Sequence, residues 1–339
     1  MRLIKTEDAV GHVLCHDMTQ IIKDQYKDAR FRKGHVVTEE DIPVLLSMGK
    51  EHLYVWEMTP GMVHENDAAE RLLALCGQEN MIRSGVKEGK IELKAACDGV
   101  FLVDSARLVA VNSQDEVMIA TRKGGMAVRE GDKLAGMRVI PLIIEEEKLR
   151  KAEQAAGDKP LLSLKPYVRK TACIVATGGE VKKGLIKDTF TPVVIDKLKT
   201  YGIETLEVIY SGDGVENVRD AVLTMREKKP DMILCTGGMS VDPDDNTPGG
   251  IKAAGANIIA YGAPVLPGAM FLLGYFDDGM PVMGLPGCVM YAGATVFDLV
   301  LPKIAADVPV TRADIAALGE GGLCLGCKPC HYPICPFGK

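Results

Sequence analysis

The most constraining feature of this sequence is a regular alternation of short apolar runs and amphipathic segments that begins at residue 171. The apolar runs have the length and composition of buried strands, and they are ACIVA (172–176), TLEVIY (205–210), DMILCT (231–236) and PVMGL (281–285). The segments with helical character are 192–202, 215–229, 247–255 and 290–306. Strands that alternate with helices are typical of a parallel sheet covered on both faces. We therefore expect residues 171–310 to form a three-layer α/β domain, doubly wound around a mostly parallel sheet.

Residues 1–60 are predicted to form a separate N-terminal α/β-rich region. The stretch RFRKGHVVTEEDIPVLLSMG (30–49) has the pattern of a turn, a short strand and a helix. In this interpretation Thr38 is the N-cap of the helix, Asp41 completes an imperfect capping box, and Gly49 ends the helix.

Residues 61–157 are predicted to hold a helix, within 61–82, followed by a small β-rich domain. The runs that alternate or are rich in strand-forming residues are IELKAACDGVFLVD (91–104), RLVAVN (107–112), EVMIATR (116–122) and KLAGMRVIPLII (133–144). A polar helix is expected over 145–157. Pro160 and Pro166 then mark residues 158–170 as a linker.

Charge and composition exclude several classes of function. The net charge is −6 and no Lys/Arg-rich run is present, which argues against nucleic acid as a partner. The first residues lack the apolar core of a signal peptide. Residues 253–276 carry no charged side chain, but Pro264, Pro267 and several glycines favour buried strand and tight loops over a membrane helix. We expect a soluble, cytoplasmic protein with no membrane partner.

Three predicted strands end in loops that are suited to a phosphate. The loops begin TGGE (177–180), TGGMS (236–240) and PGC (286–288). Ligands of an open α/β sheet lie at the carboxyl ends of its strands, and paired glycines let the backbone approach a phosphate closely. One such loop alone is better explained by a tight turn, whereas three at one edge of the sheet favour a ligand. The predicted cofactor-binding residues are Thr177, Gly178, Gly179, Thr236, Gly237, Gly238, Ser240, Thr247, Pro286 and Gly287.

The second loop continues into an acidic run that contains Asp242, Asp244 and Asp245. Three carboxylates beside a phosphate would repel it unless a cation such as Mg²⁺ binds both, and Asp244 is one candidate ligand. The alternative is that Asp242 and Asp244 flank a turn at Pro243 and that Asp245 or Thr247 caps the next helix. We expect at least one functional carboxylate and favour Asp245.

These loops, in this order, resemble the molybdopterin-binding domain of the MoeA/gephyrin E-domain and MogA type, over about Cys173 to Val310. KGHVVTEEDIPVLLSMG (33–49) is more weakly similar to a segment of the molybdopterin molybdenumtransferases. The resemblance implies a domain that binds the phosphate of the pterin molybdopterin. It also implies Mg²⁺-dependent work on that pterin, either adenylylation or the insertion of molybdate. By the same resemblance Asp245, Glu180 and Asp242 are the candidate catalytic residues.

The sequence departs from the molybdenumtransferase pattern at two positions. Those proteins usually have Asp where this chain has Gly179, and Asn where it has Cys288. The PDDNTP stretch (243–248) looks closer to the adenylylating and competence-damage (CinA) relatives. Three functions therefore stay open: an enzyme of molybdenum-cofactor synthesis, a non-catalytic molybdopterin carrier or sensor, and a CinA-like nucleotide hydrolase. Relatives self-associate, so we expect a homo-oligomer, and a molybdoenzyme or a cofactor-pathway protein is a candidate partner.

Four cysteines are concentrated in residues 320–339, and they are Cys324, Cys327, Cys330 and Cys335. Closely spaced thiols in a reducing compartment suit a metal site, either Zn²⁺ or an iron–sulfur cluster, with His331 as a possible replacement ligand. The alternative is a flexible, redox-sensitive tail without metal. Elsewhere His12, Cys15 and His16 could form a metal site, although structural roles explain them more simply.

Overall fold

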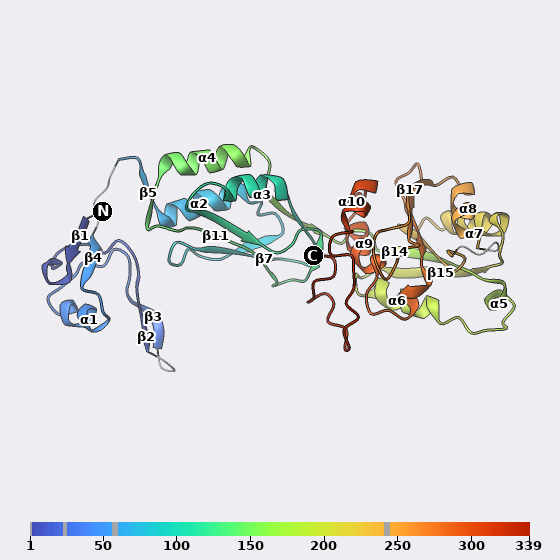
Figure 1. The fold of residues 1–339 in the computed structure, drawn as a ribbon, viewed down its shortest axis with the longest axis horizontal. Coiled ribbons are helices and arrows are strands. Elements are labelled where there is room, and N and C mark those ends of the chain that lie inside the picture. Colours follow the sequence, from blue (N-terminus) through green and yellow to red (C-terminus); the bar gives the residue numbers. More distant parts are fainter. Residues whose placement is uncertain (1, 23–25, 56–59, 241–244) are drawn as a thin grey trace. The chain divides into compact units, whose positions relative to one another are not determined.

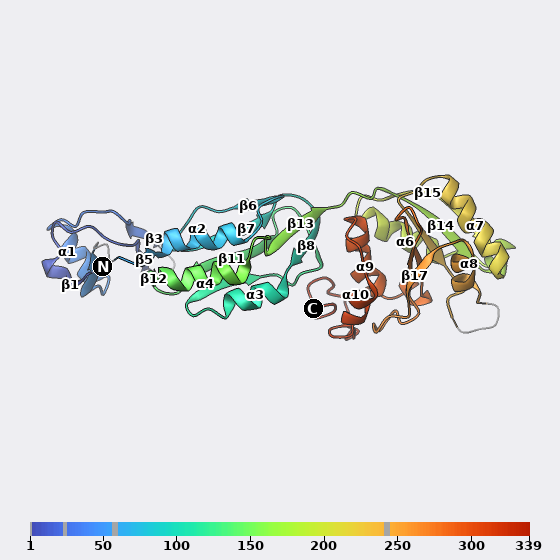
Figure 2. The same ribbon diagram turned by 90° about the horizontal axis from the view of Figure 1, so that it is seen from above.

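The computed structural model describes residues 2–22, 26–55, 60–240 and 245–339, except for the side chains of Tyr26 and Glu180. Two compact units divide the chain. The first consists of residues 1–96, 103–124 and 130–163, and the second of residues 97–102, 125–129 and 164–339. Figures 1 and 2 show their elements.

The first unit begins with two antiparallel strand pairs and one helix. Its elements are β1 (Arg2–Lys5), β2 (Met18–Ile22), β3 (Tyr26–Phe31), α1 (Asp41–Ser47) and β4 (His52–Val55). Strand β1 pairs with β4, and β2 pairs with β3. Leu14, Leu45 and Leu53 are buried in a small core of their own.

The start of α1 differs from our prediction, because Glu40 rather than Thr38 is the residue before the first helical turn. Thr38 instead donates hydrogen bonds from its N–H (2.9 Å) and Oγ1 (2.8 Å) to Asp41 Oδ2. The predicted pair of side chains therefore does interact, but Thr38 is the donor to the first helical residue and is not the N-cap.

The rest of the first unit has a four-stranded antiparallel sheet in the order β6-β7-β11-β9 among the described residues. These strands are β6 (Met81–Arg83), β7 (Ile91–Ala95), β9 (Val117–Thr121) and β11 (Lys133–Val139). The further elements are β5 (Met62–His64), α2 (Glu65–Leu75), α3 (Ser105–Asn112), β12 (Ile143–Glu145) and α4 (Glu146–Ala156). Strand β5 pairs with β12.

Residues 107–112, which we predicted as a strand-like run, lie in helix α3. Asp104 starts this helix, because its side chain accepts a hydrogen bond from Arg107 N at 3.1 Å. Val109 is 66% exposed while Val111 is fully buried. The run RLVAVN is short enough to fit either pattern, so the cap at Asp104 decides between strand and helix.

The second unit has a six-stranded sheet in the order β15-β14-β16-β19-β18-β17. Its strands are β14 (Thr171–Thr177), β15 (Glu204–Ser211), β16 (Met232–Thr236), β17 (Asn257–Tyr261), β18 (Leu272–Tyr275) and β19 (Pro281–Leu285). Strands β14, β15, β16 and β19 are mutually parallel, whereas β17 and β18 are antiparallel additions. The predicted mostly parallel sheet is therefore confirmed.

Helices cover both faces of this sheet (Figures 1 and 2). They are α5 (Gly179–Lys182), α6 (Phe190–Lys199), α7 (Val215–Glu227), α8 (Thr247–Ala253), α9 (Val296–Ala305) and α10 (Arg312–Ala317). Ile174 of β14 packs in a core with α6 and α9, whereas its neighbour Val175 packs in a second core with α7 and α8. Successive strand residues point to opposite faces, so this division establishes the three layers.

A smaller sheet in the order β10-β8-β13 is formed by β8 (Gly99–Val103), β10 (Met126–Val128) and β13 (Leu162–Pro166). Most of its residues belong to the second unit, and β13 lies within the segment 158–170 that we expect to act as a linker. In the described part of the chain, no helix has the length and apolarity needed to cross a membrane. Residues 253–276 instead contain β17 and β18, as predicted.

The last long helix is shorter than the predicted 290–306. Residues 287–290 form a 3-10 turn, η2 (Gly287–Met290), and α9 begins only at Val296. Thr295 is its N-cap in a full capping box, in which Thr295 N donates to Asp298 Oδ2 at 2.7 Å. This cap fixes the start of the helix and leaves residues 291–294 as a loop.

Candidate functional site

The candidate site lies where the parallel strands of the second unit reach their carboxyl ends. Thr177, Ser211, Thr236 and Leu285 are the last residues of β14, β15, β16 and β19. These strands are neighbours in parallel register, so the loops that follow them lie along one edge of the sheet. The three predicted loops are three of these four.

Buried threonines connect the first and second loops. Thr177 Oγ1 donates to the carbonyl of Thr236 at 2.9 Å and lies 3.2 Å from Thr247 Oγ1. Thr247 Oγ1 in turn donates to the carbonyl of Gly237 at 2.9 Å. All three threonines are at least 92% buried. Their hydroxyl groups therefore position the loops relative to each other, and the protons of Thr177 and Thr247 are already donated within the protein.

The second loop requires glycine at two consecutive positions. Gly237 and Gly238 have φ values of +81° and +57°, a region that side chains disfavour. A Cβ at Gly237 would lie 2.4 Å from the carbonyl oxygen of Thr177, and one at Gly238 would lie 2.5 Å from Thr247 Oγ1. Glycine at both positions therefore lets the second loop pack directly against Thr177 and Thr247.

A fourth loop, which our sequence analysis did not assign to the site, holds the first one. Asp213 follows β15, and its Oδ2 accepts a hydrogen bond from Gly179 N at 3.0 Å. A Cβ at Gly179 would lie 2.7 Å from the same oxygen. Glycine at 179 thus leaves room for the carboxylate of Asp213. The position of Asp213 after a parallel strand is the signal that could have indicated it.

The predicted carboxylates are only partly described. Asp245 Oδ2 accepts a hydrogen bond from Ser240 N at 3.1 Å, so this carboxylate closes the second loop. Asp242 and Asp244 lie outside the described residues. The backbone of Glu180 lies in α5, but its side chain is also outside the described part.

The third loop approaches the segment before α6. Thr189 Oγ1 donates to Met290 Sδ at 3.1 Å, which joins this segment to η2. Asp188 Oδ1 accepts from Phe190 N (2.9 Å) and Thr191 N (3.0 Å). Burial alone would raise the pKa of Asp188, but its hydrogen bonds outweigh burial and hold the pKa below its ordinary value. Asp188 is therefore an anion at neutral pH.

Pro286 follows the last residue of β19, and Gly287 is the first residue of η2. A Cβ at Gly287 would meet nothing within 4 Å, so glycine is not needed here to avoid a steric clash. Its lack of a side chain leaves this part of the sheet edge uncovered. Burial raises the pKa of the Cys288 thiol, which leaves it neutral at physiological pH.

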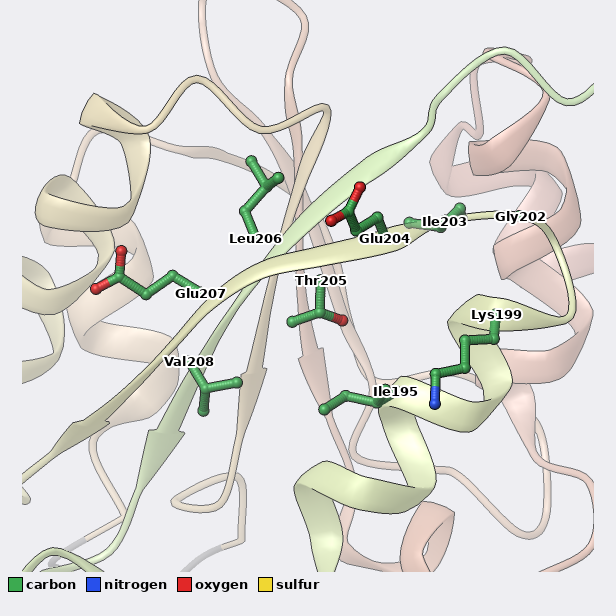
Figure 3. A pocket seen from close by; sticks show the side chains of 9 residues that line it. All are labelled: Ile195, Lys199, Gly202, Ile203, Glu204, Thr205, Leu206, Glu207 and Val208. Atoms are coloured by element: carbon green, nitrogen blue, oxygen red, sulfur yellow. The ribbon is translucent and has the colours of Figure 1, made fainter.

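A depression of about 600 Å³ lies elsewhere, along β15 and α6 (Figure 3). It is lined by Ile195 and Lys199 of α6 and by residues 202–208. Residues 202–208 lead into β15 and form its beginning, whereas the glycine loops follow the carboxyl ends of the strands. The depression is therefore separate from the candidate site.

Comparison with known families agrees with this geometry. Residues 173–306 match the family described as "Probable molybdopterin binding domain". This segment contains all four loops. The domain formed by residues 173–306 belongs to this family. Residues 3–57 match a second family, a domain of unknown function (DUF8806).

The curated relatives are CinA-like proteins that align with a small part of the chain. The protein from Mycobacterium tuberculosis (strain ATCC 25177 / H37Ra) is 33% identical over 76 residues, which are 22% of this chain and 18% of the relative. The protein from Petrotoga mobilis is 32% identical over 76 residues, 22% of this chain and 19% of the relative. The chain thus spans about a fifth of the length of these relatives.

Solved structures with similar folds come from molybdenum-cofactor and CinA proteins. The molybdopterin biosynthesis enzyme MoaB from Thermus thermophilus has 17% identity and a TM-score of 0.35, covering 41% of this chain and 98% of that chain. CinA from Thermoplasma acidophilum has 18% identity and a TM-score of 0.35, covering 40% and 98%. A molybdenum cofactor biosynthesis protein from Pyrococcus furiosus has 13% identity and a TM-score of 0.27, covering 93% and 64%.

Proposed function

We propose that the molybdopterin-binding domain binds molybdopterin, or its adenylylated form, at the glycine loops and acts in molybdenum-cofactor biosynthesis. The observation that carries this proposal is the joining of the first and second loops by Thr177 and Thr247 at the carboxyl edge of the sheet. The match of residues 173–306 to the family described as "Probable molybdopterin binding domain" supports a pterin as the ligand class.

The phosphate of the pterin would bind the backbone of these loops. Successive N–H groups in turn conformations form concavities for anions, and Gly237 and Gly238 supply such a turn. Ser240 follows in the same loop and is exposed, so its hydroxyl group is accessible to a ligand. The threonines beneath hold this backbone in place and need not contact the ligand.

The residues of the second loop fit a role for Mg²⁺ at the bound phosphate. Mg²⁺ is usually bound by one or two carboxylates together with substrate phosphates, so it needs no preformed cage of protein ligands. Asp245 would supply one carboxylate, with Asp242 or Asp244 as the second. When bound, Mg²⁺ would neutralise phosphate charge and orient the phosphate. This arrangement supports either adenylyl chemistry or the insertion of molybdate.

The experiment is a comparison of binding and turnover in the purified full chain. Molybdopterin and its adenylylated form are titrated with and without Mg²⁺, and AMP release is followed with and without molybdate. We expect Mg²⁺ to tighten binding, AMP release to require molybdate, and Asp245→Ala to abolish the Mg²⁺ effect. Asp220→Ala, an exposed carboxylate on α7, is the matched control and should change nothing. Pterin binding without AMP release would instead indicate a non-catalytic carrier or sensor.

A second candidate function is favoured by the CinA-like relatives. In that case the same loops would hold the phosphates of a nucleotide, and the reaction would be hydrolysis of that nucleotide. Nucleotide hydrolysis without pterin, lost in Asp245→Ala, would support this function. The absence of both pterin binding and nucleotide hydrolysis would exclude both candidates.

A further inference from the structure

The cysteine-rich tail is a packed part of the second unit. Leu323 forms a bridge with Leu266, and Cys324 N donates to the carbonyl of Leu266 at 2.8 Å. Phe337 is 98% buried in the core that also contains α6 and α9. The hydroxyl group of Tyr332 donates to the carbonyl of Asp298 in α9 at 3.0 Å. The backbone of the tail is therefore fixed by the α/β domain on which it lies.

This packing brings the four thiols of the tail to one cavity. Cys324, Cys327, Cys330, Cys335 and His331 all line a space of about 370 Å³, and residues 291–294 also line it. Cys327 and Cys330 are exposed, whereas Cys324 and Cys335 are half-buried. The Sγ of Cys330 lies close to the loop, since a Cβ on Gly293 would be only 2.8 Å from it.

The spacing of the thiols and the size of the cavity suit a metal cluster better than a single ion. A zinc ion with four thiolates at 2.3 Å would draw the sulfur atoms to about 3.8 Å from one another and would fill the space between them. The thiols instead line a cavity much larger than one ion. In a four-iron cluster each iron takes one cysteine, so the thiolates lie around the cluster.

We propose that Cys324, Cys327, Cys330 and Cys335 bind a four-iron, four-sulfide cluster in this cavity. The first three follow the spacing C-x2-C-x2-C, which suits ligands from one short loop. A cluster with four thiolate ligands is anionic, and the positive charge of Lys328 on the cavity lining favours it. His331 lines the cavity but is not needed as a ligand.

The position of the cavity links the cluster to the glycine loops. Residues 291–294 follow η2 directly, and η2 is the third loop of the candidate site. The cluster would therefore stabilise the loop next to the pterin site. This inference rests on the tail alone, and it stands whether the neighbouring loops bind a pterin or a nucleotide.

The test is anaerobic purification of the full chain from iron-replete cells, followed by reconstitution with ferrous iron and sulfide. Iron, sulfide and zinc are counted per chain, and the visible absorption and the electron paramagnetic resonance of the dithionite-reduced protein are recorded. We expect about four iron and four sulfide per chain with a broad visible absorption.

Variants separate the tail from other sites. Cys327→Ser and Cys330→Ser change exposed residues and should leave the thermal unfolding of the metal-free protein unchanged, while iron after reconstitution falls to less than about one per chain. Cys97→Ser outside the tail and His331→Ala within it should keep the cluster. One zinc per chain in place of iron, an absence of bound metal after reconstitution, or equal iron content in the Cys330→Ser and Cys97→Ser variants would overturn the proposal.

Discussion

At the scale of single residues, glycines with positive φ explain why the second loop has its sequence. Gly238 has φ +57°, and a Cβ added there would approach Thr247 Oγ1 to 2.5 Å, whereas Gly255 has φ +93° and open space around it. A side chain would strain the backbone at both positions, but only at Gly238 would it also clash with a neighbouring atom. A comparison of the two positions therefore separates backbone strain from the steric clash. Both effects belong to the residue and neither depends on the ligand.

We predict that Gly238→Ala lowers the free energy of unfolding by about 2–4 kcal/mol, since it adds a clash to the left-handed conformation. Gly255→Ala, the matched control, should cost only about 1–2 kcal/mol. Urea denaturation of both variants measures the difference. Equal losses would show that the contact with Thr247 does not constrain the loop.

Asp213 gives a second prediction at this scale. Asp213→Ala removes the acceptor of Gly179 N, a hydrogen bond to a charged group worth about 1.5 kcal/mol. We expect molybdopterin to bind about tenfold more weakly as the first loop loses its position. Asp213→Asn keeps an acceptor and should retain most of the affinity. Unchanged binding in Asp213→Ala would remove this residue from the site.

At the scale of elements, the amino ends of β14 and β16 are joined by one carboxylate. Asp231 Oδ2 accepts hydrogen bonds from Lys170 N (2.6 Å), Thr171 N (2.8 Å) and Thr171 Oγ1 (2.9 Å). Burial alone would raise the pKa of Asp231, but these hydrogen bonds outweigh burial and lower it. The charged form of Asp231 therefore stabilises the central strand pair.

The lowered pKa of Asp231 determines how its contribution to the free energy of unfolding changes with pH. The folded-state pKa of Asp231 lies below its unfolded value of about 3.9, so its contribution is present above that pH and is lost as the pH falls through the folded pKa. We predict that Asp231→Asn costs about 1–2 kcal/mol at pH 7 and progressively less below about pH 4. Denaturation at several pH values measures this. A loss that does not depend on pH would contradict the assignment.

The strands, helices and loops also show which features of the fold could be predicted from the sequence and which could not. The apolar runs and paired glycines identify the parallel strands and three loops, because each is a local pattern. The contact of Asp213 with Gly179 joins residues 34 positions apart, and no local pattern contains it. Residues 107–112 and the start of α9 were mispredicted because caps at Asp104 and Thr295, rather than apolar spacing, decide where those helices begin.

At the scale of the whole molecule, the chain combines a domain that matches the molybdopterin-binding family with an N-terminal region (1–172) and a C-terminal segment (307–339) that this match does not cover. The tail docks on that domain through Leu323, Tyr332 and Phe337. Its cysteine spacing was visible in the sequence, but its docking was not, since Leu266 and Leu323 are far apart along the chain. Residues 3–57 match a separate family and carry no assigned role.

If the tail is part of the core of the second unit, truncation of its buried side chains should lower the stability of the protein. Phe337→Ala removes a side chain that is 98% buried and should cost about 3–5 kcal/mol. Ile334→Ala alters an 86% exposed side chain of the same tail and should cost less than about 0.5 kcal/mol. Thermal unfolding of the two variants compares them. Similar stabilities would show that the tail is not part of the domain core.

The most direct test of the central claim is a titration of the full chain with molybdopterin under anaerobic conditions, compared between the natural sequence, Gly238→Ala and Gly255→Ala. We predict saturable binding to the natural sequence, binding weakened at least about tenfold in Gly238→Ala, and near-natural binding in Gly255→Ala. Circular dichroism confirms that each variant is folded at the temperature used. An absence of binding to the natural sequence, or equal affinities for Gly238→Ala and Gly255→Ala, would contradict the assignment of a pterin site to the glycine loops.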